Sequence, residues 1–194
     1  HNELGNKKTA LEYFNQALSL HKSIGNRVGE LTSLMSISMA YQRIGDYQKS
    51  LTFSDQGAAL AGELGDHSRE GSAFNNLCVL YQDMGDFKRA IDYCNRALEI
   101  RHTYNDQLGE AVTLGNLGGV TADLGDYQQA LDFYQRAEAK YTSLGNRSGQ
   151  GIAINNIGMV YATLGDRDKA LDFYSRAAEM FIAMDDQYRA ATAL

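Results

Sequence analysis

The sequence is punctuated every 20 residues by one short pattern, an aliphatic residue or methionine followed by Gly and then by Asp or Asn. A fixed period of this length is typical of a repeat protein, so it limits the fold before any other feature is considered. The pattern occurs at Leu4-Gly5-Asn6, Ile24-Gly25-Asn26, Ile44-Gly45-Asp46, Leu64-Gly65-Asp66, Met84-Gly85-Asp86, Leu124-Gly125-Asp126, Leu144-Gly145-Asn146 and Leu164-Gly165-Asp166. Two positions depart from it, at Tyr104-Asn105-Asp106 and Met184-Asp185-Asp186.

The repeated pattern predicts turns between helices. Glycine closes a helix easily because it adopts the left-handed backbone conformation, which Asn and Asp also tolerate. The Asp or Asn that follows can cap the next helix by accepting a hydrogen bond from a free backbone N–H group. The two departures therefore also predict turns.

Segments between the turns alternate in kind, which makes the true period 40 residues, with two helices in each repeat. We name them A helices and B helices. A lone B helix is expected at 6–24, A–B pairs at 26–64, 66–104, 106–144 and 146–184, and a partial A helix at 186–194. The sequence thus predicts a single all-α array of about 10 helices. Because it begins just before a B helix and stops inside an A helix, we expect a piece of a longer array, since natural solenoids end in polar capping helices.

Small residues recur at two positions of the B helices, which predicts close helix packing there and a clash for large side chains. They are Ala10, Ser50, Ala90, Ala130 and Ala170 at the first position, and Ala17, Gly57, Ala97, Ala137 and Ala177 at the second. Both classes of helix carry their apolar residues on one face, as packed amphipathic helices do.

Composition excludes several classes of partner. No apolar run reaches the length of a membrane span, and the N-terminus lacks the features of a signal peptide. The formal net charge is −6 and no block of Lys and Arg occurs, which argues against nucleic acid or an anionic membrane as the main partner. Cys78 and Cys94 are too few for a disulfide framework and are expected to be buried thiols, with a reactive pair as the alternative. This favours a reducing, cytoplasmic setting.

Catalytic groups do not converge in the sequence. His21, His67 and His102 fall in different repeats, and the Cys and His residues lack the spacing of metal ligands. The glycine-rich run at 115–120 is not a phosphate loop, because no strand precedes it and no Lys follows at the required spacing. We therefore expect no enzyme activity, no cofactor and no metal.

Aromatic and small residues at fixed positions carry a family resemblance. The third repeat has Leu117-Gly118, Thr121 where a tyrosine is usual, Gly125-Asp126-Tyr127, Ala130, Tyr134 and Ala137, and the fourth has Ile157-Gly158, Tyr161, Gly165, Ala170, Tyr174 and Ala177. This pattern resembles the tetratricopeptide repeat over the whole chain. The 40-residue period departs from the usual 34, and the proline that the family places after helix B is missing. Long repeats of this kind are similar to LGN-type polarity adaptors, kinesin light chains and many bacterial signalling proteins.

The resemblance implies a right-handed superhelix in which A helices line a concave groove and B helices form the convex face. It also implies a non-enzymatic adaptor that binds a segment of a partner protein in that groove. Two alternatives stay open. One is a sensory or autoinhibitory region of a larger signalling protein, and the other is self-association through apolar faces at the array ends.

A column of asparagines lies beside the packed face of the A helices. Asn76, Asn116 and Asn156 recur at intervals of 40 residues, with Ser36 in the first repeat. An amide offers a donor and an acceptor together, so such a ladder can bind an extended peptide backbone. Alternatively, the amides hold the stack in register by bonding to a neighbouring helix.

Neighbours of the ladder complete the predicted peptide-binding groove. They are Asn75 and Asn155 one position earlier, Met39, Val79, Gly119 and Met159 one turn later, and Arg43, Gln82, Asp83 and Asp123 beyond. The groove is polar, apolar in places, and acidic at its two Asp residues. Because Arg43 is its single basic residue, a binder of chaperone carboxylate tails is disfavoured, and a peptide with apolar and basic residues suits it better.

Overall fold

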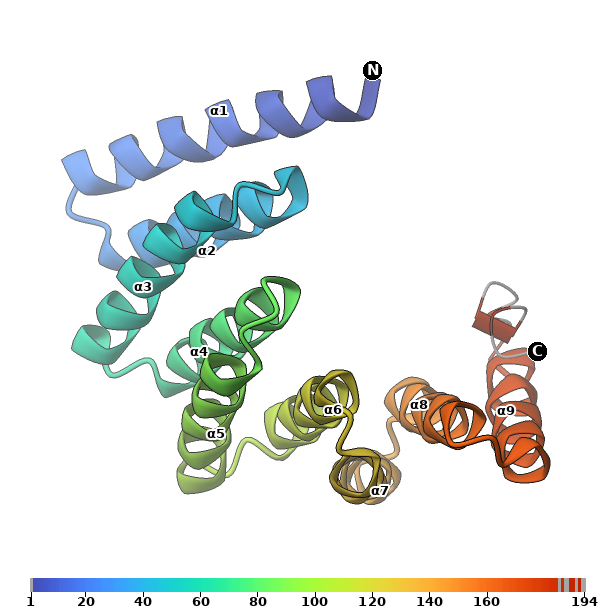
Figure 1. Ribbon diagram of the computed structural model, residues 1–194. Coiled ribbons are helices and arrows are strands. Elements are labelled where there is room, and N and C mark those ends of the chain that lie inside the picture. Colours follow the sequence, from blue (N-terminus) through green and yellow to red (C-terminus); the bar gives the residue numbers. More distant parts are fainter. Residues whose placement is uncertain (1, 185, 187–188, 191, 193–194) are drawn as a thin grey trace. The chain divides into compact units, whose positions relative to one another are not determined.

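The computed structural model describes the backbone of residues 2–184, 186, 189, 190 and 192, and every element in these ranges is a helix. Two or three residues separate each helix from the next (Figure 1). The helices are α1 (Asn2–Ser23), α2 (Arg27–Ile44), α3 (Tyr47–Leu64), α4 (His67–Asp83), α5 (Phe87–Thr103), α6 (Gln107–Leu124), α7 (Tyr127–Ser143), α8 (Arg147–Thr163) and α9 (Arg167–Ile182). The partial helix expected at 186–194 lies largely outside the described residues.

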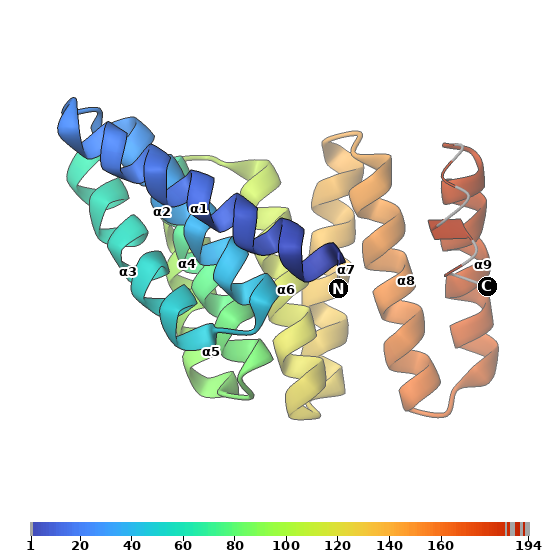
Figure 2. The ribbon, with the colours of Figure 1, turned by 90° about the horizontal axis from the view of Figure 1, so that it is seen from above.

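The chain divides into two compact units, an N-terminal unit of residues 1–104 and a C-terminal unit of residues 105–194. In the N-terminal unit each helix from α1 to α5 packs against the next, and α6 to α9 do the same in the C-terminal unit, where α6 also contacts α8. Figure 2 shows the alternating direction of successive helices within each unit. The predicted all-α helical repeat is thus confirmed.

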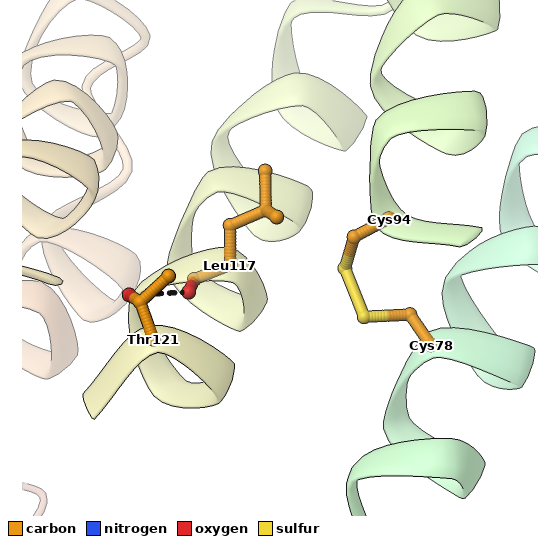
Figure 3. Close-up of a disulfide and its surroundings, with 4 residues drawn as sticks. All are labelled: Cys78, Cys94, Leu117 and Thr121. Carbon is orange, nitrogen blue, oxygen red and sulfur yellow. Dashed lines mark hydrogen bonds between the residues drawn. A yellow bond between two sulfur atoms is a disulfide. The ribbon is translucent and has the colours of Figure 1, made fainter. Parts of the chain in front are cut away.

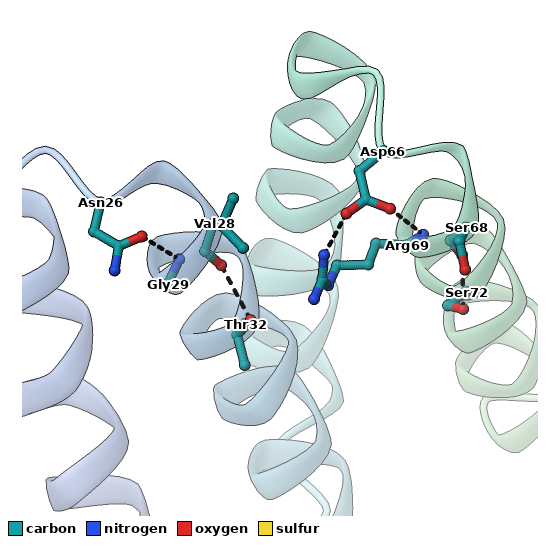
Figure 4. Close-up of polar contacts among 8 residues, drawn as sticks. All are labelled: Asn26, Val28, Gly29, Thr32, Asp66, Ser68, Arg69 and Ser72. Atoms are coloured by element: carbon teal, nitrogen blue, oxygen red, sulfur yellow. Dashed lines mark hydrogen bonds and ion pairs between the residues drawn. The ribbon is translucent and has the colours of Figure 1, made fainter.

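Helices α2 to α9 begin as the sequence predicts. The residue before each of these helices is Asp or Asn, and its side chain accepts a hydrogen bond from the backbone N–H three residues later. The acceptor–donor distance is 2.9 Å from Asn26 to Gly29 and 3.0 Å from Asp66 to Arg69 (Figure 4). Each such cap typically stabilises a helical protein by about 1 kcal/mol relative to alanine.

The turn predicted at Leu4-Gly5-Asn6 is wrong, because α1 begins at Asn2 and continues through Gly5. Later helix ends confirm the role of the glycines. Gly45 ends α2 in the left-handed conformation with φ of 86°, and Gly125 ends α6 in the same way. Asn105, which replaces glycine in the pattern, also has a positive φ, of 55°. The other expected substitute, Asp185, lies outside the described residues.

The core is formed by large aliphatic residues of the A helices against small residues of the B helices. Leu31, Ile37, Leu77, Leu117 and Ile157 are almost completely shielded from solvent, as are Ala90, Ala97, Ala130, Ala137 and Ala177 opposite them. This confirms the close packing predicted from the small residues at these positions, since a close-packed interior leaves no room for larger side chains. In α1, however, Ala10 and Ala17 are only half-buried.

One A-helix residue and one B-helix residue, 16 positions apart, meet in each repeat; we call them the crossing pair. In α2 and α3 the pair is Ser38 and Ser54, whose hydroxyl oxygens lie 2.5 Å apart. In the C-terminal unit Gly118 lies against the ring of Tyr134, and Gly158 against that of Tyr174.

The crossing pair of α4 and α5 corrects a prediction. Cys78 and Cys94 are buried, as expected, but they are joined by a disulfide rather than present as free thiols (Figure 3). The prediction was wrong because it rested on the number of cysteines and not on how the two helices cross. The antiparallel crossing of α4 and α5 brings the two cysteines together, with 5.2 Å between their Cα atoms.

Candidate functional site

The asparagine ladder lies on the A helices at half-buried positions. Asn76 is on α4, Asn116 on α6 and Asn156 on α8. In the first repeat Ser36 takes this position on α2, and its hydroxyl donates to the Thr32 carbonyl oxygen at 2.9 Å. A half-buried amide has a defined orientation and still reaches solvent, which suits contact with a ligand.

The residues one position before the ladder lie deeper. Asn75 is only 9% exposed. The side-chain oxygen of Asn155 is shielded from solvent and accepts no hydrogen bond among the described residues. Buried polar atoms are nearly always hydrogen-bonded, so this amide oxygen costs stability in the structure.

One turn beyond the ladder the predicted residues reach the surface. Met39 is 46% exposed and Met159 is 53% exposed, whereas Val79 is half-buried. The side chains of Arg43 and Asp83 are exposed, and that of Gln82 is half-buried. Exposed methionines give this face adaptable apolar surface, because the thioether side chain is flexible and polarisable.

A pocket of about 390 Å³ lies among α6, α7 and α8 in the C-terminal unit. Four of the predicted groove residues line it, namely Gly119, Asp123, Asn156 and Met159. The remaining wall is formed by Ala122, Tyr127, Tyr134, Val160 and Thr163. The structure thus brings residues of two neighbouring A helices together around one concave site.

Tyr134, on α7, links this pocket to the core. Burial, together with the smaller effect of the nearby negative charge of Asp123, raises the pKa of its phenol to about 12. The hydroxyl is therefore protonated at neutral pH and retains a hydrogen that it can donate.

A second pocket, of about 240 Å³, lies between α1 and α2 in the N-terminal unit. Ser36, Met39, Ala40 and Arg43 contribute from α2, and Ala10 and Phe14 from α1. Phe14 occupies the same place in its repeat as Tyr134, 120 residues later. The sequence prediction missed Ala10 and Phe14 because it considered A helices alone, although the 40-residue repeat places Phe14 at the position of Tyr134.

Metal-ligand clusters and membrane-spanning helices are both absent from the part of the chain that the structure describes. Within the described ranges no three His, Cys, Asp or Glu side chains are placed to hold a metal ion. Among the helices described above, none has the length and apolar character needed to cross a membrane.

Comparison with solved structures shows the same fold at low identity. BtubC from P. vanneervenii is 16% identical with a TM-score of 0.78, covering 97% of this chain and 88% of that one. A Rap protein complexed with Competence and Sporulation Factor is 18% identical with a TM-score of 0.85, and here 98% of this chain spans 54% of that protein. A STAND signal transduction ATPase with a tetratricopeptide repeat sensor, from Pyrococcus horikoshii, is 18% identical with a TM-score of 0.78 over 93% of this chain and 28% of that one. No curated protein sequence matches significantly.

Family models match the sequence directly. Two tetratricopeptide repeat models match, one at residues 69–143 and the other at residues 153–181, which together cover more than half of the chain. The matched ranges include the ladder positions Asn76, Asn116 and Asn156 and the crossing pairs of three repeats. By sequence and by fold, this chain belongs to the tetratricopeptide repeat family.

Proposed function

We propose that this chain is a non-enzymatic scaffold that binds a peptide segment of a partner protein on the A-helix face of each unit. The observation that carries the proposal is the pocket of the C-terminal unit, where Gly119, Asp123, Asn156 and Met159 converge. A concave site with apolar walls and a few polar groups is the usual form of a ligand site. The fold it shares with a Rap protein solved in complex with Competence and Sporulation Factor supports the proposal.

In this proposal the amides of Asn76, Asn116 and Asn156 bind the peptide backbone. An amide pairs with both the N–H and the C=O of an extended chain, which gives affinity with little dependence on the peptide sequence. Exposed Met39 and Met159 contact apolar side chains of the peptide. We expect the partner segment to be apolar with some basic residues, because the exposed carboxylates of Asp83 and Asp123 lie on this face and the net charge is −6.

A pull-down from source-cell lysate tests the proposal. The baits are the wild-type chain, the Asn76→Ala/Asn116→Ala/Asn156→Ala variant, and Arg136→Ala on the outer surface of α7 as a control. Circular dichroism and thermal melting first establish that all three are folded. We expect a protein captured by wild type and by the control and lost with the asparagine variant. Unchanged capture by a folded asparagine variant would instead assign the ladder to helix packing.

A second candidate function is a sensory or autoinhibitory region in a larger signalling protein. This second function is favoured by the share of a larger protein that the chain resembles, because it matches 28% of the length of an ATPase that carries a tetratricopeptide repeat sensor. The domain content of the full-length gene product distinguishes the two functions. A catalytic or DNA-binding domain in the same chain, released by deletion of these repeats, would support the sensory function.

Self-association stays a prediction, as does the compartment. Tyr13 and Leu20 of α1 and Ile24, directly after it, are exposed, which supports association through that end. A mass that rises with concentration in sedimentation equilibrium would establish it. The prediction of a cytoplasmic setting relied in part on free thiols at Cys78 and Cys94. The structure has a disulfide there instead, so that part of the argument no longer holds.

A further inference from the structure

The pocket of the C-terminal unit lies beside two small residues of α6. Only Gly119 is at a position where the other A helices carry larger side chains, because α8 also has an alanine, Ala162, at the position equivalent to Ala122. Gly119 takes the position of Met39 and Met159, and Ala122 takes that of Gln42. Between α2 and α4 the corresponding surface is bridged, since the Gln42 amide donates to the Asp83 carboxylate at 2.9 Å. Ala122 has no polar group with which to form such a bridge.

The charge around this pocket is also distinct. Asp123 is the one ionisable carboxylate in its lining, and no lining residue is basic. Residues 121–130, the turn from α6 to α7, contain Asp123 and Asp126 but no Lys or Arg. The corresponding turns at 41–50, 81–90 and 161–170 each contain two basic residues. The turn beside the pocket is therefore acidic, whereas none of the other three turns carries a net negative charge.

In those three turns the chain supplies its own cation to a tyrosine ring. Lys49 lies 5.1 Å from the ring centre of Tyr41, Arg89 lies 4.5 Å from that of Tyr81, and Lys169 lies 4.9 Å from that of Tyr161. Each cation also pairs with the Asp that caps the B helix.

The third repeat lacks this arrangement. Thr121 replaces the tyrosine, and its hydroxyl donates to the Leu117 carbonyl oxygen at 2.8 Å (Figure 3). Gln129 replaces the cation. The rings near this turn are instead those of Tyr127 and Tyr134, which line the pocket beside Asp123.

We propose that this pocket binds one Lys or Arg side chain of the partner segment, with its charged end against Asp123 and its aliphatic stem on Tyr127, Tyr134 and Met159. The inference rests on the proposed function and adds the side-chain chemistry of the ligand at one position. Lys and Arg match the site because they combine an apolar stem with a cation that is attracted by carboxylates and aromatic faces. The amide of Asn156, in the same lining, then binds the backbone beside that side chain.

The test begins with selection of a random dodecapeptide phage library on the full chain. Enriched peptides are synthesised with each basic residue replaced by norleucine, which keeps the stem and removes the charge. Affinities are measured by fluorescence anisotropy for wild type, Asp123→Asn, Ala122→Gln and the control Asp132→Asn. Asp132 is an exposed carboxylate on the outer surface of α7, so its variant makes the same charge change away from the pocket.

We expect one Lys or Arg position to be enriched, and its norleucine replacement to weaken binding roughly three- to tenfold. Asp123→Asn should weaken the basic peptide by a similar factor and leave the norleucine peptide unchanged, so that the two changes are coupled. Ala122→Gln should weaken both peptides because it fills the pocket, and Asp132→Asn should weaken neither.

Other outcomes separate the inference from the proposed function. Enriched peptides that depend on Asn116 and Asn156 but bind Asp123→Asn as tightly as wild type would overturn the inference and leave the scaffold function standing. A library with no enriched peptide, or one whose peptides bind the Asn76→Ala/Asn116→Ala/Asn156→Ala variant unchanged, would overturn both.

Discussion

Two glycines three residues apart in α6 differ in what surrounds them. A Cβ atom built on Gly115 meets nothing within 4 Å, whereas one built on Gly118 lies 2.6 Å from the ring of Tyr134. Tyr134 is buried, so its ring has little freedom to move away. Gly118 is therefore required by packing, and Gly115 carries only the entropic cost of a glycine inside a helix.

The two alanine variants should shift stability in opposite directions. We expect Gly115→Ala to raise the free energy of unfolding by about 0.5–1 kcal/mol, because alanine loses less backbone entropy in a helix. Gly118→Ala should lower it by about 1–3 kcal/mol through overpacking against Tyr134. Urea denaturation of both variants measures this. Equal shifts of the same sign would show that the Tyr134 ring yields to the added methyl group.

Asn155, one position before the ladder, allows the cost of a buried polar side chain to be tested. Its amide oxygen is buried without a hydrogen bond among the described residues, and Met35 holds the equivalent position in α2, packed against the core. Asn155→Met should therefore raise the free energy of unfolding by about 1–2 kcal/mol, since a buried unsatisfied acceptor is removed. Thermal melting and urea denaturation give the comparison. A loss of stability would mean that the amide has an interaction which the methionine cannot replace.

At the scale of helices, the contact made by the crossing pair differs from repeat to repeat. It is a pair of hydroxyls at Ser38 and Ser54, a disulfide in α4 and α5, and a glycine under a tyrosine ring in the C-terminal unit. Each kind of contact fills the space where the A helix and the B helix of a repeat cross. This explains why repeats with unlike residues at these columns share one fold.

The disulfide should make the N-terminal unit sensitive to reductant. Closing a loop of about 15 residues stabilises a fold by about 3 kcal/mol in the chain-entropy account, and 16 positions separate Cys78 from Cys94. We expect dithiothreitol to lower the free energy of unfolding of wild type by about that amount. The Cys78→Ser/Cys94→Ser variant, which reproduces the pair of α2 and α3, should be unaffected by reductant.

Urea denaturation with and without dithiothreitol provides the measurement, and Ellman titration of the unfolded chain shows whether the thiols are free. A wild-type chain that is equally stable in both conditions, with the disulfide shown to be reduced, would contradict the prediction.

The helices could be predicted from residues at their own ends, whereas the contacts between helices could not be predicted from the sequence. Asp66 and Gly45 act on the backbone within a few residues, so their positions in the sequence define where helices begin and end. The disulfide depends on how α4 and α5 cross, which the spacing of Cys78 and Cys94 alone does not encode. The pocket beside Asp123 likewise requires three helices to converge, although the small residues that line it are visible in the sequence.

At the scale of the whole molecule, capping carboxylates link folding to pH in both units. Hydrogen bonds from the side chain and backbone of Lys49 lower the pKa of Asp46, and those of Arg89 lower the pKa of Asp86. The pKa of Asp66 is also lowered, mainly by the hydrogen bond from the Arg69 backbone N–H. Asp166 in the C-terminal unit behaves in the same way through Lys169. A carboxyl with a lower pKa when folded stabilises the fold above its unfolded pKa, and this contribution is lost as pH falls through the folded value.

We therefore expect the melting midpoint to fall steeply below about pH 4, close to the ordinary carboxyl pKa of 3.8. Asp66→Asn should make this dependence shallower, because asparagine still caps, as Asn26 and Asn146 do, but does not titrate. Circular dichroism melts from pH 7 to pH 2.5 provide the test. A midpoint that is flat across this range would rule out the caps as the source of acid sensitivity.

The Cys78–Cys94 bond also determines how the chain responds to tension. Sixteen positions separate the two cysteines, and that stretch cannot lengthen while the bond is intact. Stretched from its two ends, the oxidised polypeptide reaches full extension roughly 50 Å short of the reduced one, at about 3.3–3.6 Å for each residue. The α4–α5 turn then travels as a closed loop on an otherwise linear strand, too wide to pass through any pore that admits only a single extended chain.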